Sequence, residues 1–395
     1  MFRHHYIEVG HSQIHKHSQH ICGDVFLSTR LPGEGRVISV LADGLGSGVK
    51  AAVLATLTST MLSKFVSSDI DITRAAEIIM QTLPICSQRK IGYSTFTIID
   101  VHPDGKTSII EHDNPHFVLV RNGCKVEVEK ESIELINPHS SRPMKLSLSQ
   151  LVLKPEDRIV FYSDGVSQAG MGSKEKPLGQ GEETVLETID FCLSDNQQVS
   201  ALEMAERITR RSEHLDQDKA KDDITCGVIY FRKPRKTLIV TGPPYDEERD
   251  REVALSFKNF DGKKVICGGT TSGIIARELN LEIKVNLQMF RKDIPPESIM
   301  EGANLITEGT ITLSKVYADL RDDTLKERKD TDTIRRLGEI LLDSDLIEFI
   351  VGTKINTAHH DPKLPQELEI RRNLIKNIAQ LLEQKYLKKV FLQFV

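Results

Sequence analysis

The stretch DVFLSTRLPGEGRVISVLAD, residues 24–43, constrains the fold most, because it predicts a β-hairpin with an aspartate at each end. Two apolar segments suited to strands flank PGEG, whose proline and glycines favour a turn. A turn centred between Gly33 and Glu34 places Asp24 directly opposite Asp43. Opposed side chains lie about 4.5 to 5.5 Å apart, and two like charges there destabilise a sheet unless something compensates them. A divalent cation is the simplest compensation.

A second pair of predicted strands carries aspartates at its ends in the same way. DRIVFYSD, residues 157–164, runs into Asp164, and KDDITCGVIYF, residues 221–231, begins with Asp222 and Asp223. If these strands are antiparallel neighbours, Asp164 and Asp222 lie at the same end of the sheet. Carboxylates suit the hard ions Mg²⁺ and Mn²⁺, and two such ions about 3.5 to 4 Å apart can activate water for attack on phosphorus.

An ordinary turn is the alternative explanation for Asp43, since Asp-Gly is a common turn pair. The chain has four such pairs, at Asp43, Asp104, Asp164 and Asp261. Those at Asp104 and Asp261 stand beside apolar segments as hairpin or loop turns do. Spacing alone therefore leaves both roles of Asp43 open.

Composition limits the classes of partner and compartment. The chain has 395 residues, long enough for two domains, and 52 Lys+Arg against 57 Asp+Glu, with no basic stripe. This balance argues against nucleic acid as a partner.

No apolar stretch reaches the roughly 20 residues of a membrane span, and Met1–Gly10 is polar, so we expect a soluble cytoplasmic protein. The six cysteines lack the spacing of a disulfide framework or a zinc site.

The pattern of the chain changes at RKPRKT, residues 232–237. Before it, strands and hairpins dominate, with a few helices, whereas after it strands and helices alternate. We therefore predict an α+β domain over residues 1–233 and an α/β domain with a mainly parallel sheet over residues 236–395. In the second domain, strands are predicted at 237–242, 263–269, 282–289, 303–309, 346–353 and 388–394, and helices at 246–258, 271–280, 331–343 and 366–385.

Four predicted strands of the second domain end in small polar loops, within VTGPP, CGGTTSG, TEGT and VGTKIN. Open α/β sheets bind ligands beyond the carboxyl ends of their strands, where glycine permits close approach and a helix N-terminus favours anions. The candidate residues for a small anionic ligand or a nucleotide are Gly242, Gly268, Gly269, Thr270, Thr271, Gly309 and Thr310. The alternative is a dimerisation or partner-docking domain, because tight strand-to-helix turns need glycine in any case.

Five motifs in order give a more specific indication than any single aspartate. ICGD (21–24), ADGLGSGVKAA (42–52), YSTFTIIDVHPDG (93–105), FYSDGVSQ (161–168) and KDDITCGVI (221–229) resemble the SpoIIE-type branch of the bacterial PPM metal-dependent serine/threonine phosphatases. The resemblance covers about residues 1–232. It implies a PPM-type αββα sandwich of two antiparallel sheets, while the second domain is not recognised.

The resemblance also implies an activity and a set of site residues. The family hydrolyses phosphoserine or phosphothreonine on a regulatory protein, such as an anti-anti-sigma-like regulator, with a hydroxide bound to two Mn²⁺ or Mg²⁺ ions. By position, the metal and catalytic residues are Asp24, Asp43 as the bridging carboxylate, the Gly44 carbonyl, Asp164 and Asp222, with Asp223 supporting them. We expect the second domain to control this activity, and a homodimer is possible.

The helix predicted after the glycine loop, at about 49–66, presents Val53, Leu57, Met61 and Phe65 at helical spacing. This stripe is predicted to be core. In SpoIIE-type enzymes the corresponding helix is thought to act as a switch that completes the metal site. Regulation by the position of this helix is therefore a hypothesis for this chain.

Some positions depart from the family pattern. Asp24 is followed by three apolar residues in place of two aromatics and a second aspartate, and Gln168 stands where glutamate is common. Six histidines cluster before residue 21, which suggests either a transition-metal site or a solvated strand. A catalytically inactive metal-binding scaffold that binds a phosphoprotein is the alternative function. The complete aspartate set favours the enzyme.

Overall fold

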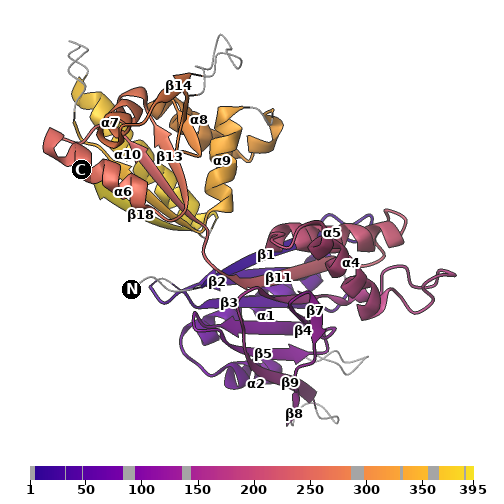
Figure 1. Ribbon diagram of the computed structural model, residues 1–395. Coiled ribbons are helices and arrows are strands. Elements are labelled where there is room, and N and C mark those ends of the chain that lie inside the picture. Colours follow the sequence, from indigo (N-terminus) through magenta and orange to yellow (C-terminus); the bar gives the residue numbers. More distant parts are fainter. Residues whose placement is uncertain are drawn as a thin grey trace. The chain divides into compact units, whose positions relative to one another are not determined.

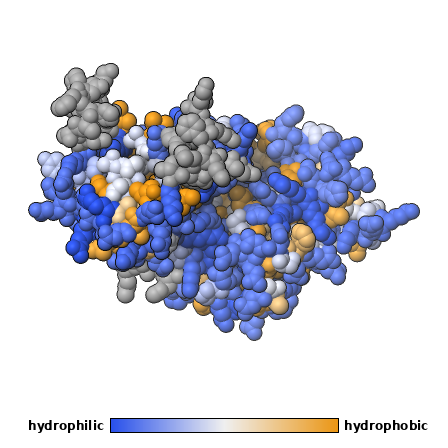
Figure 2. Space-filling view, turned by 45° about the horizontal axis from the view of Figure 1, so that its top comes forward, coloured by the Kyte–Doolittle hydropathy of each residue, from blue (hydrophilic) through white to orange (hydrophobic). Residues whose placement is uncertain are grey.

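The computed structural model describes residues 5–31, 33–46, 48–82, 94–135, 144–285, 298–329, 332–354, 364–386 and 388–395. The chain divides into two compact units, Met1–Lys233 and Pro234–Val395 (Figure 1). Each unit is described by itself. The face of the molecule shown in Figure 2 is mostly hydrophilic, with hydrophobic residues in small separate groups.

The first unit contains two antiparallel sheets. In the order of pairing, the five-stranded sheet consists of β1 (Tyr6–Ile14), β11 (Ile224–Arg232), β10 (Asp157–Tyr162), β6 (Val118–Arg121) and β7 (Cys124–Val126). The six-stranded sheet consists of β2 (Asp24–Arg30), β3 (Val37–Gly44), β4 (Ser94–Val101), β5 (Lys106–His112), β9 (Met144–Val152) and β8 (Glu131–Leu135). The helices are α1 (Val49–Ser67), α2 (Ile72–Thr82), α3 (Asp164–Ser167), α4 (Gly181–Asp195) and α5 (Ala201–Leu215).

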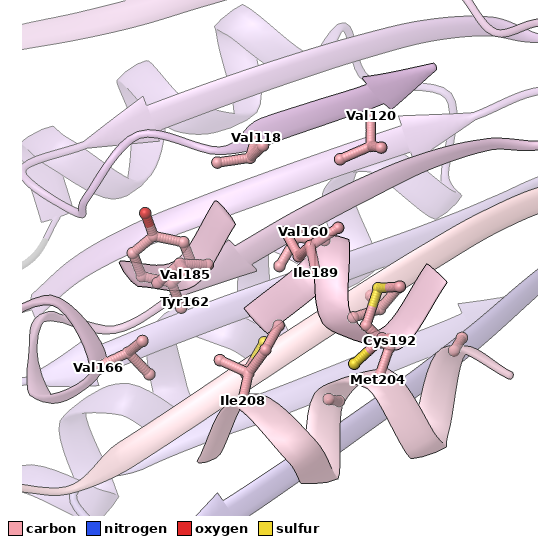
Figure 3. Packing of buried hydrophobic residues seen from close by; sticks show 14 of the residues in the cluster. Val118, Val120, Val160, Tyr162, Val166, Val185, Ile189, Cys192, Met204 and Ile208 are labelled. Atoms are coloured by element: carbon pink, nitrogen blue, oxygen red, sulfur yellow. The ribbon is translucent and has the colours of Figure 1, made fainter. Parts of the chain in front are cut away.

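Three buried clusters show how these elements are layered. Alternate residues of both sheets, such as Leu41 and Phe161, form a core between the sheets. The opposite side of the six-stranded sheet packs against α1 and α2. The opposite side of the five-stranded sheet packs against α4 and α5, as Figure 3 shows for Tyr162, Val185 and Ile208. The unit is therefore an αββα sandwich, as the resemblance implied.

Helix α1 packs on the sheet with a different face from the one predicted. Val53 and Leu57 were expected in the core, but they are 60% and 45% exposed, and Met61 and Phe65 are only partly buried. The buried face carries mainly small residues, including Ala51 and Ala55. Small side chains let the helix backbone approach the sheet closely, and a Cβ on Gly44 would overlap the carbonyl oxygen of Ala51.

Length and composition alone would allow α1 to cross a membrane, and it is the single helix of the described residues that passes this test. The expectation that no segment reaches that length was therefore wrong. Mostly buried core helices of soluble proteins pass the same test; α1 is partly buried and contacts β2, β3, β4 and α2 of the first unit.

The second unit contains a five-stranded sheet in which all the pairings are parallel, in agreement with the predicted α/β architecture. Its order of pairing is β16 (Leu305–Thr307), β13 (Lys263–Cys267), β12 (Lys236–Thr241), β17 (Leu346–Val351) and β18 (Lys389–Phe394). A separate antiparallel pair joins β14 (Ile283–Val285) and β15 (Ser298–Met300). Residues 286–289 of the predicted strand 282–289 lie outside the described residues.

Helices cover both faces of the parallel sheet. They are α6 (Asp250–Asn259), α7 (Gly269–Leu279), α8 (Gly309–Asp322), α9 (Thr333–Asp343) and α10 (Leu364–Gln384), with short 3₁₀ turns at Glu247–Arg249 and Leu325–Glu327. Buried residues of α6 and α7 pack on one face, and those of α8, α9 and α10 pack on the other. Helix α8 was not predicted, because Gly309–Thr312 is rich in poor helix formers, but Leu313, Val316 and Leu320 anchor it at helical spacing.

Candidate metal centre

The first two candidate aspartates face each other at the edge between the sheets. In the hairpin of β2 and β3, Asp24 pairs with Asp43, which confirms the predicted register. Strand alternation puts these two residues on the same side as Phe26 and Leu41, the side that faces the other sheet. Asp24 is almost fully buried and Asp43 is half-buried.

The second pair of aspartates lies at one end of the other sheet. Strands β10 and β11 are antiparallel neighbours, which was the condition for bringing the two aspartates together, so Asp164 after β10 and Asp222 before β11 are at the same end. The Gln168 side chain donates a hydrogen bond of 2.9 Å to Asp164 Oδ2. Lys16 Nζ lies 3.5 Å from Asp222 Oδ1 and brings a positive charge to this group.

Hydrogen bonds join the two sheets beside the aspartates. Thr225 Oγ1, on β11, donates to Asp24 Oδ2, on β2, at 2.7 Å. Asp223 ties the loops together, because its carboxylate accepts the backbone N–H of Gly23 at 2.8 Å and that of Lys16 at 2.9 Å. Asp223 therefore holds the backbone that carries Asp24, in keeping with the supporting role proposed for it.

The electrostatics of these carboxylates favour a cation. Burial raises the pKa of Asp43, and the negative charges of Asp24, Asp164 and Asp222 raise it further. Burial also raises the pKa of Asp24, although hydrogen bonds from Thr225 and Ser163 oppose the change. The pKa of Asp164 is raised by burial and by the charge of Asp222. A bound cation would relieve both the desolvation and the repulsion.

The two glycines that follow Asp43 and Asp164 are needed for packing, not for an unusual backbone conformation. Neither Gly44 nor Gly165 has a positive φ. A Cβ on Gly44 would overlap the carbonyl oxygen of Ala51, and a Cβ on Gly165 would overlap that of Asp223. The Asp-Gly pairs at the site are therefore places where another segment passes close to the aspartate.

The donor set fits a hydrated hard cation. Within the described residues, no group of three or more His, Cys, Asp or Glu side chains is arranged to hold one ion. Mg²⁺ in proteins commonly keeps several waters and binds through one or two carboxylates, as the opposed pair Asp24 and Asp43 could provide. The Gly44 carbonyl would be a further oxygen ligand. The described histidines form no such group either, and His11 stacks on Phe26.

Three residues near the carboxylates were not predicted from the sequence as part of the site. Lys16 and Thr225 were not considered, and Gln168 was noted only as a departure from the family pattern. For Thr225 a signal existed, because it is a polar residue in a mainly apolar strand and lies two residues after Asp223. Lys16 reaches the site through loop contacts, such as the His17 N–H to Ala220 carbonyl bond, that no local pattern indicates.

In the second unit, the predicted ligand-binding residues fall into two places. Gly268 through Thr271 follow β13, and Gly309 and Thr310 follow the adjacent strand β16. Gly242 follows β12 near Gly352, where the Arg371 guanidinium occupies the space that a Cβ on Gly242 would need. Gly242 therefore contributes to packing between β12, β17 and α10.

The family model described as stage II sporulation protein E (SpoIIE) matches residues 33–232. The chain is similar to the solved phosphatase domain of the cell fate determinant SpoIIE from Bacillus subtilis, with 16% identity, a TM-score of 0.43, and 59% of this chain and 95% of that chain covered. It is also similar to the RsbU and RsbW domains of Rv1364c from Mycobacterium tuberculosis (19% identity, TM-score 0.45, 64% and 67% covered).

A third similar structure is the serine/threonine phosphatase of S. agalactiae, with 16% identity, a TM-score of 0.41, and 57% of this chain and 99% of that chain covered. No curated protein matches the chain in sequence.

Proposed function

Because the chain belongs to the SpoIIE family, whose model matches residues 33–232, we propose that it is a divalent-metal-dependent protein phosphatase. Its substrate class is phosphoserine or phosphothreonine on a regulatory protein. The observation that carries the proposal is the opposed pair Asp24 and Asp43 at the edge between the sheets, whose carboxyl pKa values are both raised.

The residues of this chain have distinct parts in such a reaction. Asp24 and Asp43 would hold the cations, together with the Gly44 carbonyl, Asp164 and Asp222. Thr225 orients the Asp24 carboxylate and Gln168 orients that of Asp164 through their hydrogen bonds. Two Mn²⁺ or Mg²⁺ ions would supply Lewis acidity and lower the pKa of water at this position.

Lys16 is placed to act on the substrate. Its ammonium is 3.5 Å from Asp222 Oδ1 and is partly exposed. A divalent cation on Asp222 would weaken this ion pair, which would leave the ammonium available to the anionic phosphoryl group.

We propose that the second unit regulates this activity and that the first unit carries out the hydrolysis.

The first experiment measures Mn²⁺-dependent hydrolysis of an aryl phosphate by the full chain and by Asp43→Ala and Asp164→Ala. Each substitution removes an expected ligand and should lower kcat/KM at least about 100-fold. Asp104→Ala is the matched control, since it changes an exposed aspartate of another Asp-Gly pair in the same unit. Its rate should stay within about twofold of wild type.

Equal rates in all four proteins would refute the proposal that the chain is a phosphatase. The alternative function is an inactive metal-binding scaffold. It would be supported if the wild type showed no metal-dependent hydrolysis but bound Mn²⁺ in calorimetry, and if Asp43→Ala abolished that binding. If the wild type is active and the two ligand variants are not, the physiological substrate is the phosphoprotein whose phosphate content falls when the wild-type chain is added to its cellular extract.

A further inference from the structure

The second unit brings two helix N-termini together at adjacent strand ends. Helix α7 begins at Gly269, directly after β13, and helix α8 begins at Gly309, directly after the neighbouring strand β16. The loops touch, because the Gly268 N–H donates to the Thr307 carbonyl at 2.8 Å and a Cβ on Gly309 would lie 3.8 Å from Gly268 Cα.

The two helices leave the sheet in opposite directions. Buried residues of α7 such as Ile275 pack with Ile266, whereas those of α8 such as Leu313 pack with Val265 and Cys267 on the other face. Ligands of open α/β folds bind at the carboxyl end of the sheet, where the connections from adjacent parallel strands diverge to opposite faces. The comparable junction of β12 and β17 is occupied by the chain itself, since Gly352 packs against the Pro243 backbone.

The N–H groups that begin both helices have no side-chain acceptor: the N-cap of α7 is Gly268, and the side chain of Glu308, the N-cap of α8, makes no capping hydrogen bond. Neither helix has an acidic residue in its first turn. The first three N–H groups of each helix have no acceptor inside the helix. Glycine at the first position of both helices leaves these N–H groups uncovered, and nothing lies within 4 Å of a Cβ placed on Gly269.

A buried hydroxyl gives a second, independent indication of a ligand. Thr271 is 2% exposed, and its Oγ1 has no hydrogen-bond partner within the described residues. This oxygen faces Gly268, 3.3 Å from the position that a Cβ there would take. A buried donor without an acceptor destabilises the folded chain, so an acceptor arriving at this loop would remove that cost.

We propose that the loops after β13 and β16 form a binding site for the phosphoryl group of a small phosphorylated metabolite. The N–H groups of Gly269, Thr270, Gly309 and Thr310 face the anion, and the Thr271 hydroxyl donates to it. Two helix dipoles favour its negative charge. The exposed Glu308 carboxylate, just before α8, opposes binding and sets a preference for a ligand of low total charge.

The test uses the full chain in a chelating buffer, so that phosphate cannot bind through a metal ion, and inorganic phosphate as the probe. Binding is followed by the ³¹P line width. Gly269→Asp puts a carboxylate into the first turn of α7 and should weaken binding at least about tenfold. Gly273→Asp is the matched control, one turn farther along α7 at a position also open to a Cβ, and should change binding less than about twofold.

Thr271→Val separates binding from folding. It removes the unpartnered hydroxyl with little change of shape, so the variant should be at least as stable as wild type while binding phosphate about three to ten times more weakly. Glu308→Gln should tighten binding. Absence of phosphate binding by the wild type, or equal binding by wild type and Gly269→Asp, would overturn the proposal. None of these outcomes depends on phosphatase activity.

Discussion

At the scale of single residues, Asp24 and Asp43 oppose folding at neutral pH when no cation is present. Both carboxyl groups have a raised pKa in the folded chain, first because they are buried and second because other carboxylates are near. A raised pKa means that the folded state holds these protons more tightly than the unfolded state. The resulting stability is complete below the ordinary aspartate pKa of about 3.9 and is lost as the pH rises through the raised value.

We therefore predict that, in chelator, the Tm of the first unit falls between about pH 4 and neutral pH. Asp43→Asn is uncharged throughout this range, so it should raise the Tm at neutral pH in chelator and flatten the pH dependence. The same variant should lose the stabilisation by Mn²⁺. Calorimetric scans at acidic and neutral pH, with and without Mn²⁺, measure all three effects.

Asp104→Asn is the control for this prediction. Its carboxyl is exposed, and its pKa is lowered by hydrogen bonds from Lys106, so its removal cannot raise the Tm at neutral pH by the same route. If the Tm of Asp43→Asn at neutral pH in chelator were equal to or below that of the wild type, the Asp43 carboxylate would not oppose folding and the prediction would be wrong.

At the scale of elements, α1 has two faces of different chemistry. The face against the sheet is lined with small residues, and the exposed face carries Val49, Val53 and Leu57, which are 63%, 60% and 45% exposed. This helix begins a few residues after β3, the strand that carries Asp43. One hypothesis is that the position of α1 controls the metal site. It can be tested by substitutions on the exposed apolar face, because these do not disturb the core.

For α1 we predict that Val53→Lys changes the free energy of unfolding by less than about 0.5 kcal/mol, because the side chain is exposed. Ala55→Lys, two residues away on the buried face, should cost more than about 3 kcal/mol, because it puts a charge into the cluster against β3 and β4. Urea denaturation of the two variants gives both values. An equally large loss for Val53→Lys would mean that this face is covered in the folded protein. If Val53→Lys is as stable as expected, its metal-dependent phosphatase activity tests the hypothesis that the position of α1 controls the metal site.

At the scale of the whole molecule, the two units have separate cores. The clusters of the first unit contain residues from its two sheets and their helices, and those of the second unit contain residues of the parallel sheet and its helices. The boundary between the units falls between Lys233 and Pro234. The aspartate site belongs entirely to the first unit, and the proposed phosphoryl site belongs entirely to the second.

Thermal unfolding of the full chain should therefore show two transitions. Saturating Mn²⁺ should raise one of them by roughly 5 °C or more and leave the other unchanged. Asp43→Asn should abolish that shift, and phosphate in chelator should raise the other transition instead. Calorimetry measures both transitions for the wild type in chelator, in Mn²⁺ and in phosphate with chelator, and for Asp43→Asn in Mn²⁺. If Mn²⁺ raised both transition temperatures, the unfolding of the two units would be coupled, which would contradict the prediction.

Several features of the fold and of the site were predictable because they depend on local geometry. The side-chain period of two and the short PGEG turn define the register of β2 and β3, which is why Asp24 could be placed opposite Asp43. The alternation of strands and helices after Pro234 indicated a parallel sheet, because it too is a local pattern that can be recognised along the chain. Helix α8 escaped prediction because its first residues are poor helix formers and its stability comes from packing.

What the sequence by itself determined is thus which residues share a strand face and where each strand ends. Only the tertiary structure decided which face of α1 is buried, since apolar and small residues both recur at helical spacing and the close approach at Gly44 selects the small ones. It also decided that Thr225 reaches Asp24 and that the loops after β13 and β16 touch. Contacts between segments so far apart in the chain depend on how whole layers pack, and no local pattern of side chains encodes that packing.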